Sequence, residues 1–257
     1  AIKAGKDAGY LAGLFDNYRN LDVIQPSYDE KYICREDTGA LTPGFSAEGG
    51  HSQQICTQEA VKLYKHNLDY YMSALQPNVQ YLDTVGGLPF VECYDPRHPL
   101  TRSQDREQKS NLMKLALQAG IVLGVEGEPR DYNLPLASFY NEHMLRIGLD
   151  VPLYALVYHE CAVLFWQHGS PFNYGLDNYG YVRGNWLTKF LRGLLYGYPA
   201  SWTFSAKAYY AWRDTFKSIH DVMSAHHKRV AHDELVDHQI LTPDLHVQRT
   251  HFSSGVE

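Results

Sequence analysis

Two patterns divide the chain: short apolar runs, and longer segments in which apolar residues recur every three or four positions. The apolar runs predict buried strands at residues 9–15, 79–85, 121–125 and 152–158, with residues 202–204 as a weaker fifth candidate. The other pattern predicts helices at residues 57–75, 101–119, 186–196 and 205–230. Strands that alternate with helices in this order favour a parallel sheet.

Local signals indicate where the helices begin and end. Thr101 and Gln104 have the spacing of a capping box, and Gly120 is the residue expected just beyond that helix. Thr57 and Ser205 are the expected N-caps of the first and last long helices. The core face of the last helix is expected to consist of Tyr209, Trp212, Phe216, Ile219 and Met223.

The polar segments between these elements are interpreted as loops. Residues 20–56, 86–99 and 169–184 are expected to be irregular, and long loops of this kind often carry a binding function. A loop and a short helix are expected up to about residue 145, and one more helical piece after Val230. Residues 246–252 then alternate and end at a Ser-Gly pair, which predicts a hairpin whose second strand would lie beyond residue 257.

Carboxylate or histidine side chains at the end of each predicted strand favour a (β/α)8 barrel, whose active site lies on that rim. Four or five strands fall short of eight, so we expect an α/β fold of the TIM-barrel type, incomplete at its N-terminus. The expected domains are a partial barrel at 1–242 and the start of a C-terminal β-sandwich at 243–257. Since the chain does not begin with Met, we expect a fragment of a longer protein. An open doubly wound sheet is the alternative, but the sequence has no GxGxxG turn.

Composition excludes several function classes. The 257 residues are 44% hydrophobic, and a formal charge of −6 without a basic stripe argues against a nucleic-acid partner. The apolar runs are too short to span a bilayer. The compartment is left open, with a secreted or periplasmic location preferred. The cysteines show no CxxC spacing or metal-ligand pattern, so no cofactor or metal is expected, and Cys161 is expected in the core.

Two acids end successive predicted strands, and each is followed by glycine. Asp83 precedes Thr84-Val85-Gly86-Gly87, and Glu126 lies between Val125 and Gly127. We interpret Asp83 as a nucleophile. We interpret Glu126 as a general acid, because burial of its carboxyl group against an apolar strand end raises its pKa and favours the protonated form. The alternatives are a helix cap or loop ion pair for Asp83 and an ion pair for Glu126. Glu128 could act in place of Glu126.

Further polar and aromatic residues follow the same strands and loops. Aromatic faces stack on sugar rings, and the chain has 20 Tyr and 4 Trp, although core packing is their more common use. For Arg97, which lies between Pro96 and Pro99, a structural role in clamping the loop is at least as well supported. The histidines after residue 225 are interpreted as part of a solvated helix face and not as metal ligands. The candidate substrate-binding residues are Asp16, Tyr18, Arg97, His98, His159, Glu160 and Trp166.

Several of these motifs occur in the order found in one enzyme group. The chain resembles bacterial glycoside hydrolases related to families 101 and 129, the α-N-acetylgalactosaminidase group, from about Gly9 to its end. The motifs that carry the resemblance are Tyr81-Leu82-Asp83, residues 95–102, Gly124-Val125-Glu126-Gly127, residues 157–160 and residues 248–252.

The resemblance implies a retaining mechanism on a (β/α)8 barrel followed by a β-sandwich. It matches Asp83 to the family's nucleophile and Glu126 to its acid/base, and it implies an oligosaccharide or glycoconjugate with an α-linked sugar as substrate. The residues after Asp83 are Thr-Val-Gly-Gly, whereas better-studied members have an aromatic-Gly-Asn run. This difference affects the expected sugar specificity more than the expected reaction mechanism.

Two other functions fit the same sequence. A barrel that binds carbohydrate without turning it over would also be rich in Tyr and Trp. A metal-dependent hydrolase could use Asp16, His98 and His159. Turnover that is lost in an Asp83 variant would favour the glycosidase over the carbohydrate-binding barrel. Activity that is unchanged after chelation would exclude the metal-dependent hydrolase.

Overall fold

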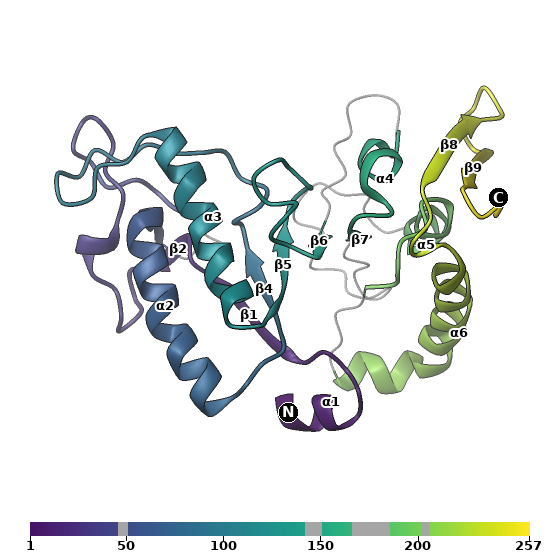
Figure 1. Cartoon of the computed structure of the whole chain (residues 1–257), viewed down its shortest axis with the longest axis horizontal. Coiled ribbons are helices and arrows are strands. Elements are labelled where there is room, and N and C mark those ends of the chain that lie inside the picture. The colour runs from purple at the N-terminus through teal and green to yellow at the C-terminus, as the bar shows by residue number, and fades with distance from the viewer. Residues whose placement is uncertain (46–50, 142–150, 166–185, 202–205) are drawn as a thin grey trace. The chain divides into compact units, whose positions relative to one another are not determined.

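The structure, a computed structural model, describes residues 1–45, 51–141, 151–165, 186–201 and 206–257 (Figure 1). These residues form two compact units, Ala1–Ser138 and Phe139–Glu257, and each unit is described by itself. A short helix, α1 (Ile2–Asp7), opens the first unit. In the parts of the chain that the structure describes, no helix is long and apolar enough to cross a membrane.

The first unit is built on three parallel strands in the order β1-β4-β5. These strands are β1 (Gly13–Asn17), β4 (Val79–Asp83) and β5 (Val122–Glu126), which confirms three of the predicted strands. Side chains alternate between the two faces of a strand, and the side chains of Gln80 and Leu82 are buried while those of their neighbours in β4 are partly exposed. The sheet therefore has one covered face and one open face.

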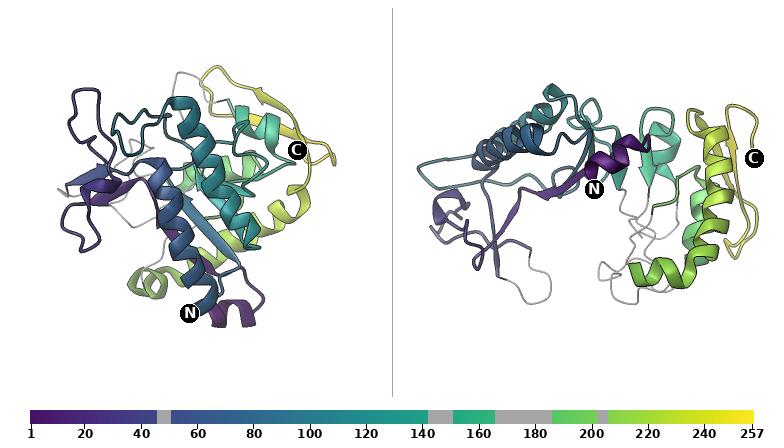
Figure 2. Two further views of the ribbon diagram at one scale, coloured as in Figure 1. Left: turned by 60° about the vertical axis from the view of Figure 1, so that its left-hand side comes forward. Right: turned by 90° about the horizontal axis from the view of Figure 1, so that it is seen from below.

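Helices α2 (Thr57–Ala74) and α3 (Arg102–Gln118) lie side by side over the covered face (Figures 1 and 2). The capping box of Thr101 and Gln104 is confirmed, and Gly120 follows α3 with a φ of +75°. Cys56 is the N-cap of α2, so the prediction for Thr57 is wrong. The Thr57 hydroxyl instead donates to the buried carboxylate of Asp105.

Asp16 of β1 lies within this helix–sheet interface. Its carboxylate accepts hydrogen bonds from Gln80 Nε2 at 2.6 Å and from the Tyr71 hydroxyl at 3.2 Å. Burial raises the pKa of Asp16, and these two hydrogen bonds oppose the rise. The carboxyl group is therefore a packing element between β1, β4 and α2, and the prediction that it binds substrate is not supported by its placement.

The raised pKa of Asp16 makes stability depend on pH. The folded state keeps this proton above the ordinary pKa of about 3.9, so stability falls as pH rises through the window between that value and the folded-state pKa. Asp16→Asn removes the titration, and its amide can still bond Gln80 and Tyr71. We expect the variant to lack this pH dependence and to be at least as stable as wild type at pH 7. Urea unfolding over a pH series measures this, and a variant with the unchanged wild-type profile would contradict the assignment.

The segment predicted as one long loop, residues 20–56, contains a small antiparallel sheet. Strand β2 (Asn20–Asp22) pairs with β3 (Ser52–Gln54), and a 3-10 turn, η1 (Glu30–Tyr32), lies between them in sequence. Isolated bridges such as Ile33 to Ile55 extend the pairing. Strands of three residues are too short to produce a recognisable alternation, so the sequence pattern missed them.

In the second unit, β6 (Phe139–Asn141) and β7 (Val163–Phe165) pair in parallel. Residues 152–158, predicted as a strand, form helix α4 (Leu153–Tyr158), so that prediction is wrong. A short run that is apolar throughout has no period, and periodicity alone cannot separate a strand from a buried helical turn. The core prediction for Cys161 is also wrong, because its side chain is exposed.

Helices α5 (Trp186–Leu195) and α6 (Ala206–Val230) confirm the two predicted helices of the second unit. The face predicted as core is buried at Phe216, Ile219 and Met223 but exposed at Tyr209 and Trp212. The helix is kinked at Trp212, where the backbone leaves the helical region. Ser205 and the weak strand candidate at 202–204 lie outside the described residues.

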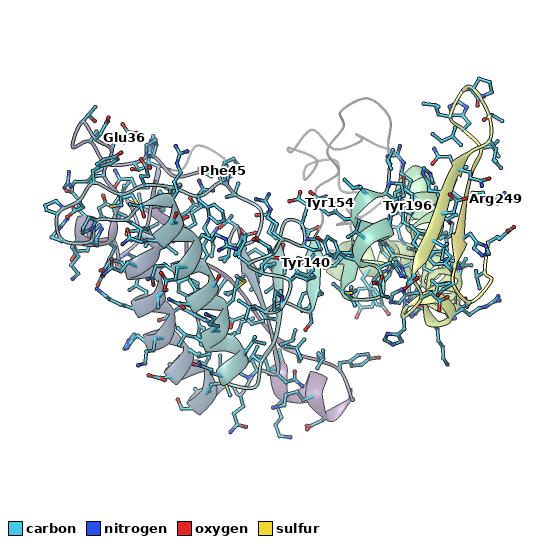
Figure 3. The ribbon with its side chains drawn as sticks, turned by 45° about the horizontal axis from the view of Figure 1, so that its top comes forward. Glu36, Phe45, Tyr140, Tyr154, Tyr196 and Arg249 are labelled. Carbon is cyan, nitrogen blue, oxygen red and sulfur yellow. The ribbon has the colours of Figure 1, made fainter. Side chains whose placement is uncertain are left out.

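The chain ends in a hairpin of β8 (Leu235–Ile240) and β9 (Gln248–Phe252). Residues 246–252 were correctly expected in a hairpin, but their partner precedes them, where a further helical piece was predicted. Tyr196, just after α5, packs edge-on against His238 of β8 (Figure 3). The hairpin spans residue 243, so a domain boundary at that residue would divide a hydrogen-bonded strand pair. The described fold is thus α/β with parallel strands.

Candidate active site

Three side chains meet at the carboxyl ends of β1, β4 and β5, on the open face of the sheet. These are Asn17, Asp83 and Glu126, each the last residue of its strand and each partly exposed. Asn17 is paired with Asp83 in the strand register, and Asn17 Nδ2 donates to Asp83 Oδ2 at 3.0 Å. The two predicted catalytic acids thus lie at the ends of adjacent parallel strands.

The amide of Asn17 has a defined orientation. Its Oδ1 accepts the backbone N–H groups of Arg19 at 2.8 Å and Asn20 at 3.0 Å, which folds the chain back after β1. Since Oδ1 is used by two donors, Nδ2 must be the atom that faces Asp83. An N–H donor at this position stabilises the ionised form of the Asp83 carboxylate, the form a nucleophile requires.

Glu126 is linked to the turn that follows Asp83. The backbone N–H of Thr84 donates to Glu126 Oε2 at 3.1 Å. Thr84 has a φ of +65°, a left-handed conformation that is costly for a β-branched residue. Strained residues of this kind cluster at functional sites, where the surrounding structure holds them in place. In this strained conformation, the backbone N–H of Thr84, the residue next to Asp83, points toward the Glu126 carboxylate.

The glycines after both strands bring the two turns together. Gly127 has a φ of +107°, and a Cβ atom added to it would lie 2.2 Å from the Cα of Gly87. Such a distance leaves no room for any side chain. The backbones of Gly127 and Gly87 are therefore in close contact, which fixes the turn after β4 against the turn after β5.

Gly127→Ala is expected to destabilise the fold by at least about 2 kcal/mol, because it adds backbone strain and an overlap with Gly87. Gly120→Ala is the matched control: its φ is +75°, but an added Cβ would have no atom within 4 Å. That variant should lose only about 1 kcal/mol, the conformational cost alone. Urea unfolding of both variants measures the difference, and equal losses would contradict the close contact.

Glu128, the alternative acid, is held in an ion pair. It is 5% exposed, and its Oε2 lies 3.2 Å from Arg130 Nη2. The same nitrogen donates to the Gly87 carbonyl at 3.2 Å. The position of Glu128 thus fits a role in holding the loop after β5, whereas Glu126 lies on the open face.

Tyr18 faces the helices and not the open face. It is buried, its hydroxyl accepts a hydrogen bond from Asn67 Nδ2 at 2.9 Å, and its ring meets that of Tyr64 edge-on. Burial raises the pKa of this hydroxyl. Tyr18 therefore packs α2 against the sheet, as Asp16 does, and this placement fits a structural role for both side chains better than the predicted substrate binding.

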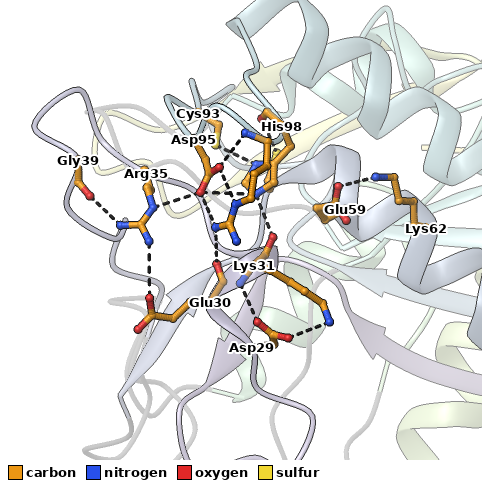
Figure 4. Close-up of polar contacts among 12 residues, drawn as sticks. Asp29, Glu30, Lys31, Arg35, Gly39, Glu59, Lys62, Cys93, Asp95 and His98 are labelled. Carbon is orange, nitrogen blue, oxygen red and sulfur yellow. Dashed lines mark hydrogen bonds and ion pairs between the residues drawn. The ribbon is translucent and has the colours of Figure 1, made fainter.

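Arg97 and His98 form part of a polar cluster around Asp95 in the loop after β4, and Figure 4 labels Asp95 and His98. Arg97 Nη2 lies 2.6 Å from Asp95 Oδ2, and Arg35 Nε reaches the same oxygen at 3.1 Å. The Arg97 hydrogen bond holds the pKa of Asp95 well below its usual range. His98 is 1% exposed. The contacts of both side chains hold this loop, which fits the clamping alternative considered for Arg97 better than the predicted substrate binding.

His159 follows helix α4 and is buried in the second unit. Its Nδ1 lies 2.7 Å from the carbonyl of Asp233, and its ring meets Phe252 edge-on. Glu160 is exposed, and its Oε1 accepts from the Cys161 thiol at 3.4 Å. Since residues 152–158 form a helix, neither residue ends a strand, and the reason for proposing them is lost. Trp166 lies outside the described residues.

Sequence reasoning missed three residues at this site. Asn17 and Thr84 were passed over in favour of their neighbours Asp16 and Asp83. Side-chain alternation was the available signal, because Asn17 lies two residues after Phe15 on the open face. The third is Arg19, which follows β1 and whose guanidinium donates to Gln54 Oε1 at 3.1 Å; burial lowers the pKa of this group, and the charge of Asp105 opposes the change. Nothing in its sequence context marked it.

Several solved structures with similar folds are glycosidases. The chain is similar to the α-N-acetylgalactosaminidase NagBb from Bifidobacterium bifidum, with 25% identity and a TM-score of 0.79 over 99% of this chain. An α-galactosidase from Thermus thermophilus has a TM-score of 0.51, 12% identity, and covers 85% of this chain and 51% of its own length. An α-L-fucosidase from Paenibacillus thiaminolyticus has a TM-score of 0.54, 15% identity, and covers 87% and 38%. The last two are similar in fold alone.

The match to NagBb covers 41% of that enzyme, so the chain spans less than half the length of this relative. No curated protein matches the chain. The family model of glycosyl hydrolases related to the GH101 family, GH129, matches residues 1–130, which contain Asp83 and Glu126. Because that match covers half of the chain and includes β1, β4 and β5, the chain belongs to the glycosyl hydrolases related to the GH101 family, GH129.

Proposed function

We propose that the protein is a retaining glycoside hydrolase in which Asp83 is the nucleophile and Glu126 is the acid/base. The observation that supports this best is the pair of adjacent strand ends, where Asn17 Nδ2 donates to Asp83 and Glu126 ends the neighbouring strand on the same face. A parallel sheet presents its catalytic side chains at this edge. Both residues fall within the part of the chain that matches the family model.

In the first step, Asp83 attacks the anomeric carbon of the sugar while Glu126 donates its proton to the departing glycosidic oxygen. Asn17 Nδ2 donates to Asp83 Oδ2 and so orients the carboxylate for this attack. In the second step, Glu126, now a carboxylate, takes a proton from water, which displaces Asp83 from the glycosyl intermediate. The configuration is inverted twice and so retained, which requires the two carboxyl groups to lie roughly 5–5.5 Å apart.

The three parallel strands form part of a (β/α)8 barrel in this proposal. The predicted start of a β-sandwich at residue 243 falls inside the β8–β9 hairpin, so no domain boundary is proposed at that residue. The open face of β1, β4 and β5 would then be the barrel interior, and the helices α2 and α3 part of its outer ring. The support for the barrel is the parallel order of β1, β4 and β5 with α2 and α3 over one face, and the TM-score of 0.79 to NagBb, a glycosidase, is compatible with it.

The substrate in this proposal is an α-linked sugar, with α-N-acetylgalactosaminide the first choice. The support is the similarity to NagBb, an α-N-acetylgalactosaminidase that has been solved with GalNAc bound. The Thr84-Val85-Gly86-Gly87 turn shapes the site beside Asp83 and so bears on which sugar fits.

Proton NMR of the full-length protein acting on p-nitrophenyl α-glycosides tests the mechanism. The α-anomer of the free sugar should appear first, followed by slow mutarotation, and the α-N-acetylgalactosaminide should be turned over fastest in the series. A β-anomer formed first would show inversion and overturn the nucleophile role of Asp83. Sugar binding without turnover of any member would favour the carbohydrate-binding alternative.

The metal-dependent hydrolase is not supported by the placement of its residues. Asp16 is bonded to Gln80 and Tyr71 beneath the helices, and His159 is buried against the Asp233 carbonyl in the second unit. His98 lies within the loop after β4, next to Cys93. Each of these side chains is already engaged with different neighbours.

A further inference from the structure

Three cysteines that are far apart in sequence converge in the interior of the first unit. Cys34 follows η1, Cys56 is the N-cap of α2, and Cys93 lies in the loop after β4. Their sulfur atoms all lie within 4.8 Å of one another, and all three side chains are buried. The fourth cysteine, Cys161, is exposed and belongs to the second unit.

His98 adds a fourth donor atom to this cluster, since its Nδ1 lies 3.3 Å from the Cys93 sulfur (Figure 4). Its other ring nitrogen, Nε2, lies 3.0 Å from the carbonyl oxygen of Lys31. A carbonyl can only accept a hydrogen bond, so Nε2 carries a proton, and in the neutral ring Nδ1 presents its lone pair to the sulfur atoms. This orienting hydrogen bond is the arrangement that metal-bound histidines show.

We propose that Cys34, Cys56, Cys93 and His98 bind one zinc ion in a tetrahedral Cys3His site. Zinc–sulfur bonds of about 2.3 Å and a zinc–nitrogen bond of about 2.0 Å place tetrahedral ligands roughly 3.5–3.8 Å apart. The Cys93 Sγ to His98 Nδ1 distance of 3.3 Å is slightly shorter than that spacing, and the three sulfur atoms, which all lie within 4.8 Å of one another, are close enough to reach it with small side-chain shifts. Four protein ligands with no open position are typical of a structural zinc site.

Two further features lie at the Cys56 sulfur. Cys56 is at the N-terminus of α2, an 18-residue helix whose dipole favours negative charge, and zinc-bound cysteines carry that charge as thiolates. The Cys56 sulfur also lies 3.6 Å from the carbonyl oxygen of His98, so the segment that carries His98 contacts both Cys56 and Cys93.

The zinc would join three segments that have little regular structure of their own. Cys34 belongs to the segment between β2 and β3, Cys56 begins α2, and Cys93 and His98 lie in the loop that starts at the strained Thr84 turn. The proposed role is therefore structural: the ion fixes the loop after β4 and does not take part in the reaction. Sequence analysis expected no metal because the ligands are not close in sequence and form no CxxC pair.

Metal analysis of the full-length protein, purified without chelators, tests the site. Plasma mass spectrometry should find about one zinc per chain, and Co2+ exchanged for zinc should show thiolate-to-cobalt charge-transfer absorption in the near ultraviolet. Cys93→Ser and Cys34→Ser should each lose most of the zinc. Cys161→Ser is the matched control and should keep it.

Two results would overturn the proposal. The first is a natively folded wild type that holds no zinc even after incubation with excess Zn2+, a result that does not depend on any variant folding. If no zinc is found, the intact mass of the protein measured under non-reducing conditions would show whether two of the three clustered cysteines form a disulfide or all remain free thiols. The second is zinc that persists in Cys34→Ser and Cys93→Ser, which would place the ion elsewhere. Neither result bears on Asp83 or Glu126, so this test is separate from that of the proposed function.

Discussion

Replacing Asp83 by Asn is expected to lower kcat/KM for aryl α-glycosides by at least about 10^4-fold, because removal of a nucleophile eliminates the covalent step. The amide cannot attack the anomeric carbon, yet it has nearly the shape of the carboxylate. Asn17 Nδ2 now faces Asp83 Oδ2 at 3.0 Å, and the Asn variant can present its amide oxygen there. The fold should therefore be preserved and the loss confined to chemistry. Steady-state kinetics and a thermal melt together measure this.

Asp16→Asn is the matched control for that experiment. It makes the same carboxylate-to-amide change in the same sheet, but on the face covered by α2, where Gln80 and Tyr71 hold the side chain. We expect kcat/KM within about threefold of wild type, because Asp16 lies on the opposite face of the sheet from Asp83 and is held by different hydrogen-bond partners. If both variants lost activity equally, or if Asp83→Asn kept more than a tenth of it, Asp83 would not be the nucleophile.

The strand ends of the first unit could be predicted from sequence because three signals agree there. Residues 79–85 and 121–125 are short, apolar and followed by glycine, and the helices before and after them have clear three-four periodicity and a capping box. Local propensity and tertiary structure favour the same elements, so β4, α3 and β5 formed where expected, with Asp83 and Glu126 at the strand ends.

The errors have a common physical cause, since each depends on information that is not local. Asp16 and Asn17 are neighbours in sequence, but only the position of α2 decides which of them is covered. Residues 152–158 would be apolar in either a strand or a helical turn, so their sequence does not distinguish the two. The helix is selected by tertiary packing, in which Ala155 is fully buried. The cysteine cluster requires the positions of three segments at once, and no spacing rule supplies them.

Glu126→Gln is expected to lower kcat/KM by about 10^2 to 10^4-fold for substrates whose leaving group needs a proton. The effect should be much smaller for dinitrophenyl glycosides, because their leaving group departs without protonation. With such a substrate, hydrolysis of the glycosyl intermediate becomes slow, since no base activates water. Added azide needs no base and should restore turnover, giving a glycosyl azide of retained α configuration. Kinetics across a leaving-group series and NMR of the azide product measure both effects.

Glu128→Gln decides which of the two acids performs this role. Glu128 is paired with Arg130, and the change should cost roughly 1–3 kcal/mol of stability with little effect on the leaving-group dependence. Glu126 is instead bonded to Thr84 N–H, an acceptor role that Gln can keep, so its variant should lose chemistry and not stability. Azide rescue of Glu128→Gln, with none for Glu126→Gln, would transfer the acid/base assignment to Glu128. Rescue of Glu126→Gln alone would place the proton transfer at the end of β5, next to the turn that Thr84 holds in its strained conformation.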